Sequence, residues 1–501
     1  MLSRFLEEAA AEDGAKTALT FEGRAYSYAE LEGRANAVAS QLRESGLGPG
    51  QRAAVILTNR PEWIIAMQAV IKTGAAVVAP MATGTLSELT HVLDLTQPAV
   101  IIAESMNTAV LASYATTALR ITIDTASDGF SSWTKVFASS SDVKIQVEVP
   151  EDAEAFLLMS SGTTGLPKAV RHSHESVEAM VHNWRWQAGM VSTDRVQFFF
   201  PACTVFGMST ILAAFGQRAE ISFFRRFNLE VMLNDVQDSK ITIGMASAPI
   251  AVSMASLPDL EKYDLSSLRY LVWGSTPISK DVAETVTARS GVRWLHAYGM
   301  TEAGSLATNP VSEPERWRLD SPGVIPPGTE TRFLDEDLKD VPAGTPGELV
   351  VRSGQTMLGY LPPEADADVL MADGWVRTGD IGFLNDDGFL FLVDRAKELI
   401  KVSGFSVSPV EIEKTLFAHP DIDDCGVYRV SDPKSGERAA AVIVLRPGAD
   451  VDEQVLLDWA AERMSSYKRL ARITFVDAIP RNPAGKVLRR KIPEMVEALA
   501  H

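Results

Sequence analysis

Short apolar runs alternate with longer stretches of helical period through roughly the first 330 residues. Such runs, when turn-forming residues bound them, are typical of strands buried on both faces of a parallel sheet. The amphipathic stretch Tyr28–Arg43 fits a crossover helix between two such strands. The pattern therefore predicts an α/β fold. The apolar runs lie at 53–58, 76–80, 99–103, 155–161 and 268–274.

The pattern changes from about residue 320 onward. Shorter apolar runs are separated there by Pro-Pro, Asp-Gly and Gly-Tyr pairs, which favour tight turns between strands. Beyond Asp394 the pattern predicts a helix, strands at 425–430 and 439–445, and a helix at 452–463. A unit of this size and order suits a small α+β domain.

The first helix of that small domain has a predicted beginning and end. Ser408 stands at the N-cap, Pro409 at the first helical position and Glu411 at the third, which is the order of a capping box. The pair His419-Pro420 predicts where the helix stops, because proline cannot continue it.

Composition narrows the class of protein. The 501 residues are 46% hydrophobic and 22% charged, as in soluble globular chains of several domains. A formal net charge of −18 argues against a nucleic-acid partner. The two cysteines, Cys203 and Cys425, allow no disulfide framework and no four-ligand zinc motif, which suits a reducing cytoplasm. We expect neither a signal peptide nor a membrane-spanning helix, because apolar runs of sufficient length are missing from the sequence.

The segment SSGTTGLPK, Ser160–Lys168, carries the sharpest chemical signal. It follows an apolar run, and its backbone N–H groups and hydroxyls can converge on phosphate oxygens while Lys168 adds a positive charge. The spacing differs from the P-loop GxxxxGK[ST], since Leu166-Pro167 precedes the lysine. A solvated Gly/Thr turn is the alternative for the segment taken alone.

The segment YGMTE, Tyr298–Glu302, also follows an apolar run. An aromatic ring can stack on a base, a threonine hydroxyl can meet a phosphate oxygen, and a carboxylate can hold Mg²⁺ between phosphates. Taken alone, Tyr298 packing in the core and Glu302 beginning a helix would explain the segment as well.

Two weaker signals lie nearer the C-terminus. Thr378–Asp380 (TGD) follows the predicted strand DGWVR, and Asp394-Arg395 lies about 15 residues further on; a carboxylate and a guanidinium can bracket a ribose diol. A turn aspartate and a surface ion pair form the alternative. In PRNPAGKVLRRK, 480–491, a lysine after a Pro/Gly turn can reach into a cleft, although basic tails are usually solvated.

Together these segments resemble one family, the acyl-adenylate-forming enzymes, which include acyl-CoA synthetases, aryl-CoA ligases, peptide-synthetase adenylation domains and beetle luciferases. The resemblance runs through SSGTTGLPK, YGMTE, TGD, DRAKELIKVSGFSVSPVEIE and the PxxxxGK ending, in family order and over nearly the whole chain. It implies a large N-terminal adenylation domain of several subdomains, 1–394, and a small mobile α+β C-terminal domain, 395–501.

The resemblance also implies a role for each matching residue. Tyr298 would stack on adenine, Thr301 would touch the α-phosphate and Glu302 would bind Mg²⁺. Asp380 and Arg395 would hold the ribose of ATP. The remaining contacts implied for ATP and the edge of the acyl pocket are Ser160, Ser161, Gly162, Thr163, Thr164, Gly165, Lys168, Gly274 and Ser275.

In the family the small domain rotates between two half-reactions. Lys486 resembles the lysine that bridges the carboxylate and the α-phosphate while acyl-AMP and pyrophosphate form. Lys397 stands at the hinge position. Rotation about it would withdraw Lys486 and present Lys401 and Gly404 to the tunnel through which coenzyme A enters. The cofactors implied are ATP, Mg²⁺ and coenzyme A.

This sequence departs from the family at two positions. Many relatives carry a histidine or aromatic residue where Thr204 stands, which leaves the second half-reaction open. Trp273 replaces a small residue, and its ring either shortens the acyl pocket or packs in the core. We expect the neighbouring Cys203 to be a buried structural thiol, and His172 and His174 to be structural or loop residues rather than metal ligands.

The sequence thus predicts an ATP-dependent acid–CoA ligase whose acid cannot be named. One alternative is a stand-alone adenylating enzyme that passes its adenylate to a carrier protein or an amine. Another is activation of an unusual acid such as nitrite. A non-catalytic nucleotide sensor is disfavoured, because Lys486, Lys401, Glu302 and the phosphate loop are all present.

Overall fold

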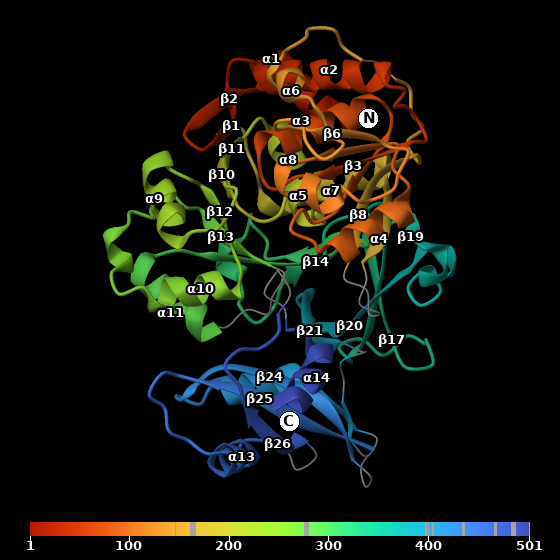
Figure 1. The fold of residues 1–501 in the computed structure, drawn as a ribbon. Coiled ribbons are helices and arrows are strands. Elements are labelled where there is room, and N and C mark those ends of the chain that lie inside the picture. Colours follow the sequence, from red (N-terminus) through yellow and green to blue (C-terminus); the bar gives the residue numbers. More distant parts are fainter. Residues whose placement is uncertain are drawn as a thin grey trace.

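A computed structural model describes the chain over residues 1–145, 147–160, 167–274, 280–395, 398, 400–402, 405–432, 436–464, 468–481 and 487–499. Within these residues a large α/β N-terminal part is followed by a small C-terminal domain with a sheet of its own (Figure 1). The α/β class predicted from the apolar runs is confirmed, as is the large-plus-small architecture. The boundary at 394/395 stays a prediction.

The first sheet has eight strands among the described residues, and its centre is parallel. β8 and β9 form an antiparallel pair, and β19 joins β9 antiparallel at the edge. In sheet order the strands are β19 (Gly359–Leu361), β9 (Lys168–Ser173), β8 (Glu154–Ser160), β4 (Ala76–Ala79), β3 (Arg52–Ile56), β5 (Val100–Ala103), β6 (Leu119–Thr122) and β7 (Ser131–Ser132).

The second sheet has thirteen strands in the described part of the chain, parallel from β14 to β1 and antiparallel elsewhere. In sheet order they are β17 (Thr329–Leu334), β18 (Gly347–Ser353), β20 (Val376–Leu384), β21 (Phe389–Arg395), β16 (Gly323–Val324), β15 (Gly304–Thr308), β14 (Trp294–Met300), β13 (Tyr270–Trp273), β12 (Ile243–Ala246), β10 (Arg195–Phe198), β11 (Glu220–Phe223), β1 (Thr17–Phe21) and β2 (Arg24–Ser27).

Helices connect and cover these strands. The predicted crossover helix is present as α2, and Ser27 begins it by accepting a hydrogen bond from the backbone N–H of Glu30. The helices of the N-terminal part are α1 (Arg4–Asp13), α2 (Tyr28–Glu44), α3 (Pro61–Lys72), α4 (Leu86–Thr96), α5 (Ser105–Leu111), α6 (Thr134–Ala138), α7 (His174–Ala188), α8 (Val205–Gln217), α9 (Leu229–Ser239), α10 (Ala248–Ser256) and α11 (Lys280–Ser290).

The five apolar runs singled out in the sequence are all strands: β3, β4, β5, β8 and β13. Their side chains are buried on both faces, as near-continuous runs require. They contribute to two hydrophobic clusters in the N-terminal part, the larger of which extends from Leu2 to Leu295. No described helix is both long enough and apolar enough to cross a membrane.

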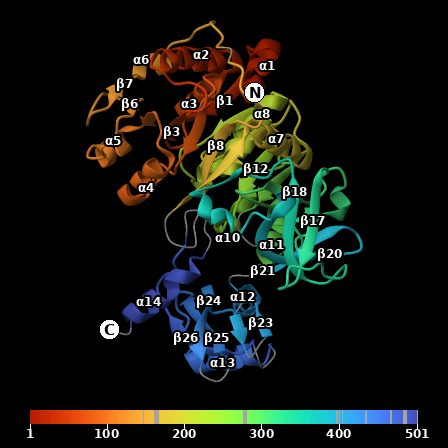
Figure 2. The ribbon, with the colours of Figure 1, turned by 90° about the vertical axis from the view of Figure 1, so that its right-hand side faces the viewer.

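The C-terminal domain has its own hydrophobic core, formed by residues such as Ile400, Ile412, Val427 and Leu456. It lies at the opposite end of the molecule from α1 and α2, next to β21, in both views (Figures 1 and 2). Its elements are β22 (Ile400–Val402), β23 (Phe405–Val407), α12 (Pro409–Phe417), β24 (Ile422–Asp432), β25 (Gly436–Leu445), α13 (Glu453–Ala461), β26 (Leu470–Phe475) and α14 (Ile492–Leu499).

Of the capping box predicted for the first helix of this domain, the described residues show only the serine half at α12, where the Glu411 carboxylate bonds with Lys468 instead. Pro409 is its first residue, and the Ser408 hydroxyl accepts a hydrogen bond from the backbone N–H of Glu411 at 3.1 Å. The helix ends at Phe417, two residues before His419. The Ser408 cap thus marks the beginning of the helix, and Pro420 follows its end closely, as expected of a residue that cannot continue a helix.

One expectation about the elements is wrong. Thr378–Asp380 does not follow a strand but lies inside β20. Side chains alternate inward along β20 at Val376, Thr378 and Asp380, so two of the inward positions are polar and the apolar run ends early. Gly379 has a φ of +70°, a conformation that favours glycine.

Candidate active site

The predicted phosphate loop connects two strands of the first sheet. Ser160 ends β8 and Lys168 begins β9, and the two residues are register partners. Lys168 places its Nζ 5.2 Å from the centroid of the Tyr360 ring on β19. The intervening predicted contacts, Ser161, Gly162, Thr163, Thr164 and Gly165, lie outside the described residues.

The YGMTE segment forms the end of β14 and the turn into β15. Tyr298 is on β14, Thr301 and Glu302 form the turn, and β15 begins at Gly304. A Cβ at Gly299 would lie 2.4 Å from the carbonyl oxygen of Gly304, so a side chain there would separate the two strands. The glycine permits the tight pairing that fixes the turn.

Glu302 is buried where the two sheets of the N-terminal part meet. The hydroxyl of Tyr360 donates a hydrogen bond of 2.8 Å to Glu302 Oε1. Nε2 of His172, on β9, donates to the carbonyl oxygen of Thr301 at 2.8 Å. Burial lowers the pKa of His172 to about 4, so the imidazole is neutral at pH 7. One strand of the first sheet thus holds the Thr301–Glu302 turn of the second.

Asp380 lies close to Tyr298. The Tyr298 hydroxyl donates to Asp380 Oδ2 at 2.5 Å, and the Asp380 backbone N–H donates to the Thr378 hydroxyl at 3.0 Å. Asp380 on β20 and Arg395 on β21 are register partners, so the spacing of about 15 residues brings the two positions opposite each other.

Gly274 lies beside the beginning of the same segment. It follows the last residue of β13, and a Cβ built there would be 3.7 Å from the carbonyl oxygen of Ala297. The described residues from five separate segments therefore converge: the ends of β8 and β9, the end of β13, the β14–β15 turn, β19, and β20 with β21.

Comparison with known proteins gives this geometry a context. The model of the AMP-binding enzyme family matches residues 6–361, and that of the AMP-binding enzyme C-terminal domain matches residues 411–486. The chain belongs to the AMP-binding enzyme family. Its predicted family resemblance is confirmed.

Individual relatives cover nearly the whole of this AMP-binding enzyme. It is 33% identical over 486 residues to 4-coumarate–CoA ligase 2 of Solanum tuberosum. The aligned region covers 94% of this chain and 88% of that ligase. ATP-bound MatB from Rhodopseudomonas palustris has a TM-score of 0.90 and 26% identity, with 100% of both chains covered. The amide bond synthetase McbA from Marinactinospora thermotolerans has a TM-score of 0.89 and 26% identity, and the match covers 99% of this chain and 100% of the McbA chain.

The residues of this AMP-binding enzyme also fit a magnesium ion bound with a nucleotide. No group of three or more His, Cys, Asp or Glu residues that could hold a metal lies in the described part of the chain. Mg²⁺ is usually held by one or two carboxylates together with substrate phosphates. Glu302 supplies one buried carboxylate beside Lys168 and Tyr360, which matches that donor set.

The C-terminal site residues are placed only in part. Lys401 lies on β22, where its register partner is Ser406 of β23. Ser275, Lys397, Gly404 and Lys486 lie outside the described residues, and so do the side chains of Lys401 and Arg395. The roles assigned to these residues stay predictions.

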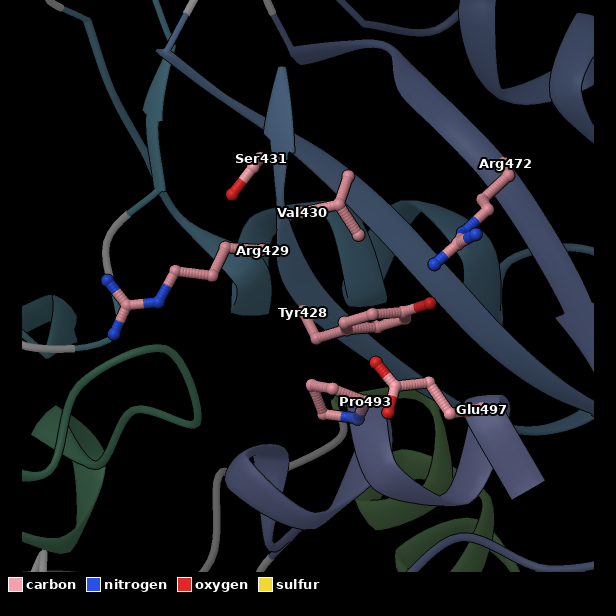
Figure 3. A pocket seen from close by; sticks show the side chains of 7 residues that line it. All are labelled: Tyr428, Arg429, Val430, Ser431, Arg472, Pro493 and Glu497. Carbon is pink, nitrogen blue, oxygen red and sulfur yellow. The ribbon is translucent and has the colours of Figure 1, made fainter. Parts of the chain in front are cut away.

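A separate hollow of about 470 Å³ lies on the C-terminal domain between β24, β26 and α14 (Figure 3). Tyr428, Arg472 and Glu497 are among its lining residues, and the sequence predicts no site residue there. Arg472 and Glu497 are both exposed, so the hollow is a feature of the surface. We do not assign the candidate site to it.

The two departures from the family pattern have structural explanations. Thr204 is the N-cap of α8, since its Oγ1 accepts from the backbone N–H of Gly207 at 3.1 Å. Trp273 is fully buried and packs edge-on against Trp294, with 5.1 Å between the ring centroids. Of the two interpretations of Trp273, core packing is the one that the structure supports.

The structural interpretations of Cys203 and His174 also agree with their surroundings. Burial raises the pKa of the Cys203 thiol to about 12, and its Sγ lies 3.8 Å from Sδ of Met81, so it is not an activated nucleophile. His174 is buried at the start of α7, and burial together with the N-terminal ammonium lowers its pKa to about 4.

Two residues of the site were missed in the sequence. Tyr360 belongs to a Gly-Tyr pair, which by itself indicates only a turn. His172 was assigned a structural role without a partner, because its contact with Thr301 joins residues 129 positions apart. Neither contact has a signal in the local sequence.

Proposed function

We propose that this AMP-binding enzyme uses ATP to activate a carboxylic acid as acyl-AMP, releases pyrophosphate, and transfers the acyl group to the thiol of coenzyme A. The observation that carries the proposal is the convergence of Lys168, Glu302 and Asp380 from three distant segments onto one place. Its relatives include proteins named 4-coumarate–CoA ligase and an ATP-bound MatB, which supports ATP and coenzyme A as substrates.

The first half-reaction joins two anions, so the site must offset their repulsion. The acid's carboxylate oxygen attacks the α-phosphorus, and the bond from that phosphorus to the pyrophosphate oxygen breaks. Lys168 and the backbone of 160–165 hold the β- and γ-phosphates, Tyr298 stacks on adenine, and Asp380 with Arg395 holds the ribose. Glu302 binds Mg²⁺, which when present neutralises charge on the phosphates. Lys486 bridges the carboxylate and the α-phosphate, and Thr301 contacts the latter.

The second half-reaction uses the same site after the small domain has moved. The thiol sulfur attacks the acyl carbon of the mixed anhydride, the carbon–oxygen bond breaks so that AMP leaves with the bonding electron pair, and the thiol proton passes to water. Rotation about Lys397 withdraws Lys486 and brings Lys401 and Gly404 to the entry of the pantetheine arm. The unpaired, buried state of both cysteines suits a reducing compartment, which we propose to be the cytoplasm.

The acid itself is best found by experiment. Because Trp273 packs in the core, its bulk gives no reason to favour a short acid. We would measure ATP–pyrophosphate exchange with a panel of hydroxycinnamic, benzoic, malonic and straight-chain acids, and then add coenzyme A. Acid-dependent exchange followed by a thioester is the expected result. ATP consumption that yields ADP and phosphate would refute the proposal.

A second candidate differs only in the acceptor. The likeness to McbA, described as an amide bond synthetase, favours transfer of the acyl group to an amine. Thr204 uses its hydroxyl to cap α8 at the position where many relatives carry a histidine or aromatic residue near the thiol path. Supplying an amine or coenzyme A separately to enzyme that has formed its adenylate distinguishes the two. A carrier-protein acceptor and an unusual acid such as nitrite remain further outcomes of the same assay.

A further inference from the structure

Three hydrogen bonds from one side fix the turn that carries Glu302. His172 Nε2 donates to the Thr301 carbonyl oxygen, the Met357 backbone N–H donates to the Glu302 carbonyl oxygen at 2.9 Å, and the Tyr360 hydroxyl donates to Glu302 Oε1. Two of these bonds hold the backbone. The third is the only one of the three that reaches the carboxylate.

Tyr360 is itself held firmly. It lies on β19, where it is the register partner of Val170 on β9, and its backbone N–H donates to Asp366 Oδ1 at 2.6 Å. Its side chain is 5% exposed and packs with Val170 and Met357. Its hydroxyl is the donor of the 2.8 Å hydrogen bond to Glu302 Oε1, because the carboxylate oxygen accepts.

The direction of this hydrogen bond has a consequence for the carboxylate. A side chain of Glu bonded through one oxygen cannot rotate freely, and it presents the second oxygen in one direction. No residue in the described ranges donates a hydrogen bond to Oε2 of Glu302, whereas Oε1 is occupied by Tyr360. As far as the described residues show, Oε2 is the oxygen that this arrangement presents to a cation.

The ring of Tyr360 makes a second contact. Its face lies 5.2 Å from Nζ of Lys168, within the range of a cation–π attraction. Tyr360 thus touches both an anionic and a cationic side chain of the candidate site, through different parts of one side chain. The hydroxyl can be removed without the ring, which makes the two contacts separable by mutation.

We propose that Tyr360 is a positioning residue that orients the Glu302 carboxylate toward the metal of the metal–nucleotide complex through its hydroxyl and holds the Lys168 ammonium at the phosphates through its ring. The inference rests on the proposed function, in which Glu302 binds Mg²⁺ and Lys168 contacts phosphate. Tyr360 touches no reacting atom in this scheme. It acts only through its two neighbours.

The test compares binding by calorimetry for the full-length protein and its Tyr360→Phe, Tyr360→Leu and Glu302→Gln variants. ATP binding is measured over a series of Mg²⁺ concentrations, and AMP binding is measured without Mg²⁺. We expect Tyr360→Phe to raise the Mg²⁺ concentration for half-maximal ATP binding about tenfold, the usual effect of losing a residue that orients a metal ligand. Its AMP affinity should stay within about twofold of the parent's, because AMP lacks the phosphates that share the metal.

Tyr28→Phe is the matched control. Tyr28 is a buried tyrosine like Tyr360, and its hydroxyl donates to the carbonyl oxygen of Ala219 at 2.6 Å, far along the chain from the site. Loss of that hydroxyl should lower the melting temperature and leave the Mg²⁺ midpoint unchanged. If Tyr360→Phe instead lowers the melting temperature and leaves the Mg²⁺ midpoint where it was, the role of Tyr360 is only structural and the proposal is overturned.

The double variant Tyr360→Phe/Glu302→Gln separates this inference from the function beneath it. If Tyr360 acts through Glu302, adding Tyr360→Phe to Glu302→Gln causes no further shift in the Mg²⁺ midpoint. If the double variant instead shifts the Mg²⁺ midpoint beyond that of Glu302→Gln by as much as Tyr360→Phe does alone, the proposal is overturned. The metal role of Glu302 would then still stand. If Glu302→Gln alone leaves the Mg²⁺ dependence unchanged, the metal role of Glu302 fails, and the inference fails with it. Tyr360→Leu should weaken ATP binding beyond Tyr360→Phe, because it also removes the ring from Lys168.

Discussion

Two buried carboxylates, Glu302 and Asp380, each accept a hydrogen bond from a tyrosine hydroxyl. Glu302 is bonded by Tyr360 and Asp380 by Tyr298. A hydrogen bond to a buried carboxylate offsets part of the cost of burying it, and here each tyrosine supplies one such bond. Each of these bonds also fixes the orientation of its carboxylate. Recognition of a nucleotide requires carboxylates of fixed orientation.

Asp380→Asn tests the ribose assignment. An amide keeps the size of the side chain but accepts hydroxyl hydrogen bonds less strongly, so ATP and AMP should bind about 10- to 100-fold more weakly, in line with about 1.5–3 kcal/mol for a hydrogen bond to a charged group. Measured with 2′,3′-dideoxy-ATP, the parent and the variant should bind with nearly equal affinity. A loss of the same size with the dideoxy nucleotide would show that Asp380 does not act through the ribose. Tyr298→Phe, which keeps the aromatic face, should cause a smaller loss than Asp380→Asn.

At the level of elements, two hairpins define the site. The β8–β9 pair carries the phosphate segment, the β14–β15 pair carries Thr301 and Glu302, and His172 on β9 joins them by its hydrogen bond to the Thr301 carbonyl oxygen. That bond requires a proton on Nε2, which the neutral Nε2–H tautomer supplies, and burial disfavours the charged ring. Protonation would leave this bond in place but would put a charge in a buried position, so its effect on stability comes from burial of the ring.

The pH dependence of stability follows from the lowered pKa of His172. The unfolded chain takes up a proton near pH 6.5, whereas the folded state resists until about pH 4. The free energy of unfolding is thus at its full value above pH 6.5 and falls by about 1.4 kcal/mol per pH unit for this group as the pH drops toward 4. His172→Gln should therefore remove this slope from the plot of unfolding free energy against pH. Urea unfolding between pH 5 and 7.5 measures the effect.

The exposed His182, on α7, supplies the control for this measurement. His182→Gln should leave the slope of stability against pH unchanged. Should His172→Gln and the parent show parallel curves over the same range, the buried, neutral state of His172 would be refuted. Equal flattening by both variants would show that burial is not the cause.

The beginning of α8 gives a prediction about the departure at Thr204. Removing its cap with Thr204→Ala should cost about 1 kcal/mol of stability, while Thr204→Ser keeps the hydroxyl and costs little. Urea unfolding measures the first effect, and thioester formation from the adenylate measures any role in transfer. A Thr204→Ala protein of unchanged stability that loses only thioester formation would contradict a purely capping role.

How far the sequence predicts the elements depends on what faces inward. Strands such as β3, whose side chains are apolar on both faces, were predicted with nearly correct ends. The strand around Thr378 and Asp380 was cut short, because its inward side chains are polar and serve the site. The direction of Trp273 was undecidable, because it depends on the register of β13 with its neighbours. Polar residues of a functional site fit the apolar pattern of a buried strand poorly, because they are buried for their chemistry and not for packing.

The candidate site was predictable in its composition and only partly in its contacts. Asp380 and Arg395 were expected near each other, and their strands place them as register partners. The contact of Tyr360 with Glu302 was not foreseen, because it joins different sheets across 58 residues of chain. Pairings of this kind depend on how the sheets pack, and a single sequence does not contain that information in its local pattern.

At the scale of the whole molecule, the small C-terminal domain is expected to serve each half-reaction in turn. This domain has its own hydrophobic core, which a domain needs if it is to move as a rigid body. Lys486→Ala should abolish formation of acyl-AMP and leave the reaction of synthetic acyl-AMP with coenzyme A largely intact. Equal loss in both assays would refute the role of Lys486.

A restriction of the hinge should have the opposite effect. Lys397→Pro, which fixes a backbone angle, should slow thioester formation from synthetic acyl-AMP more than it slows pyrophosphate exchange. Both rates are measured on the same preparation. If exchange suffers more than transfer, movement about residue 397 does not serve the second half-reaction.

Transfer of an oxygen label tests the central claim most directly. With the acid that the exchange panel selects, carrying ¹⁸O in its carboxylate, mass spectrometry of the products follows the oxygen that attacks phosphorus. Attack at the α-phosphorus leaves that oxygen as the bridge of acyl-AMP, so one ¹⁸O per turnover must appear in AMP and none in pyrophosphate. Label in inorganic phosphate, with ADP as the nucleotide product, would contradict the account.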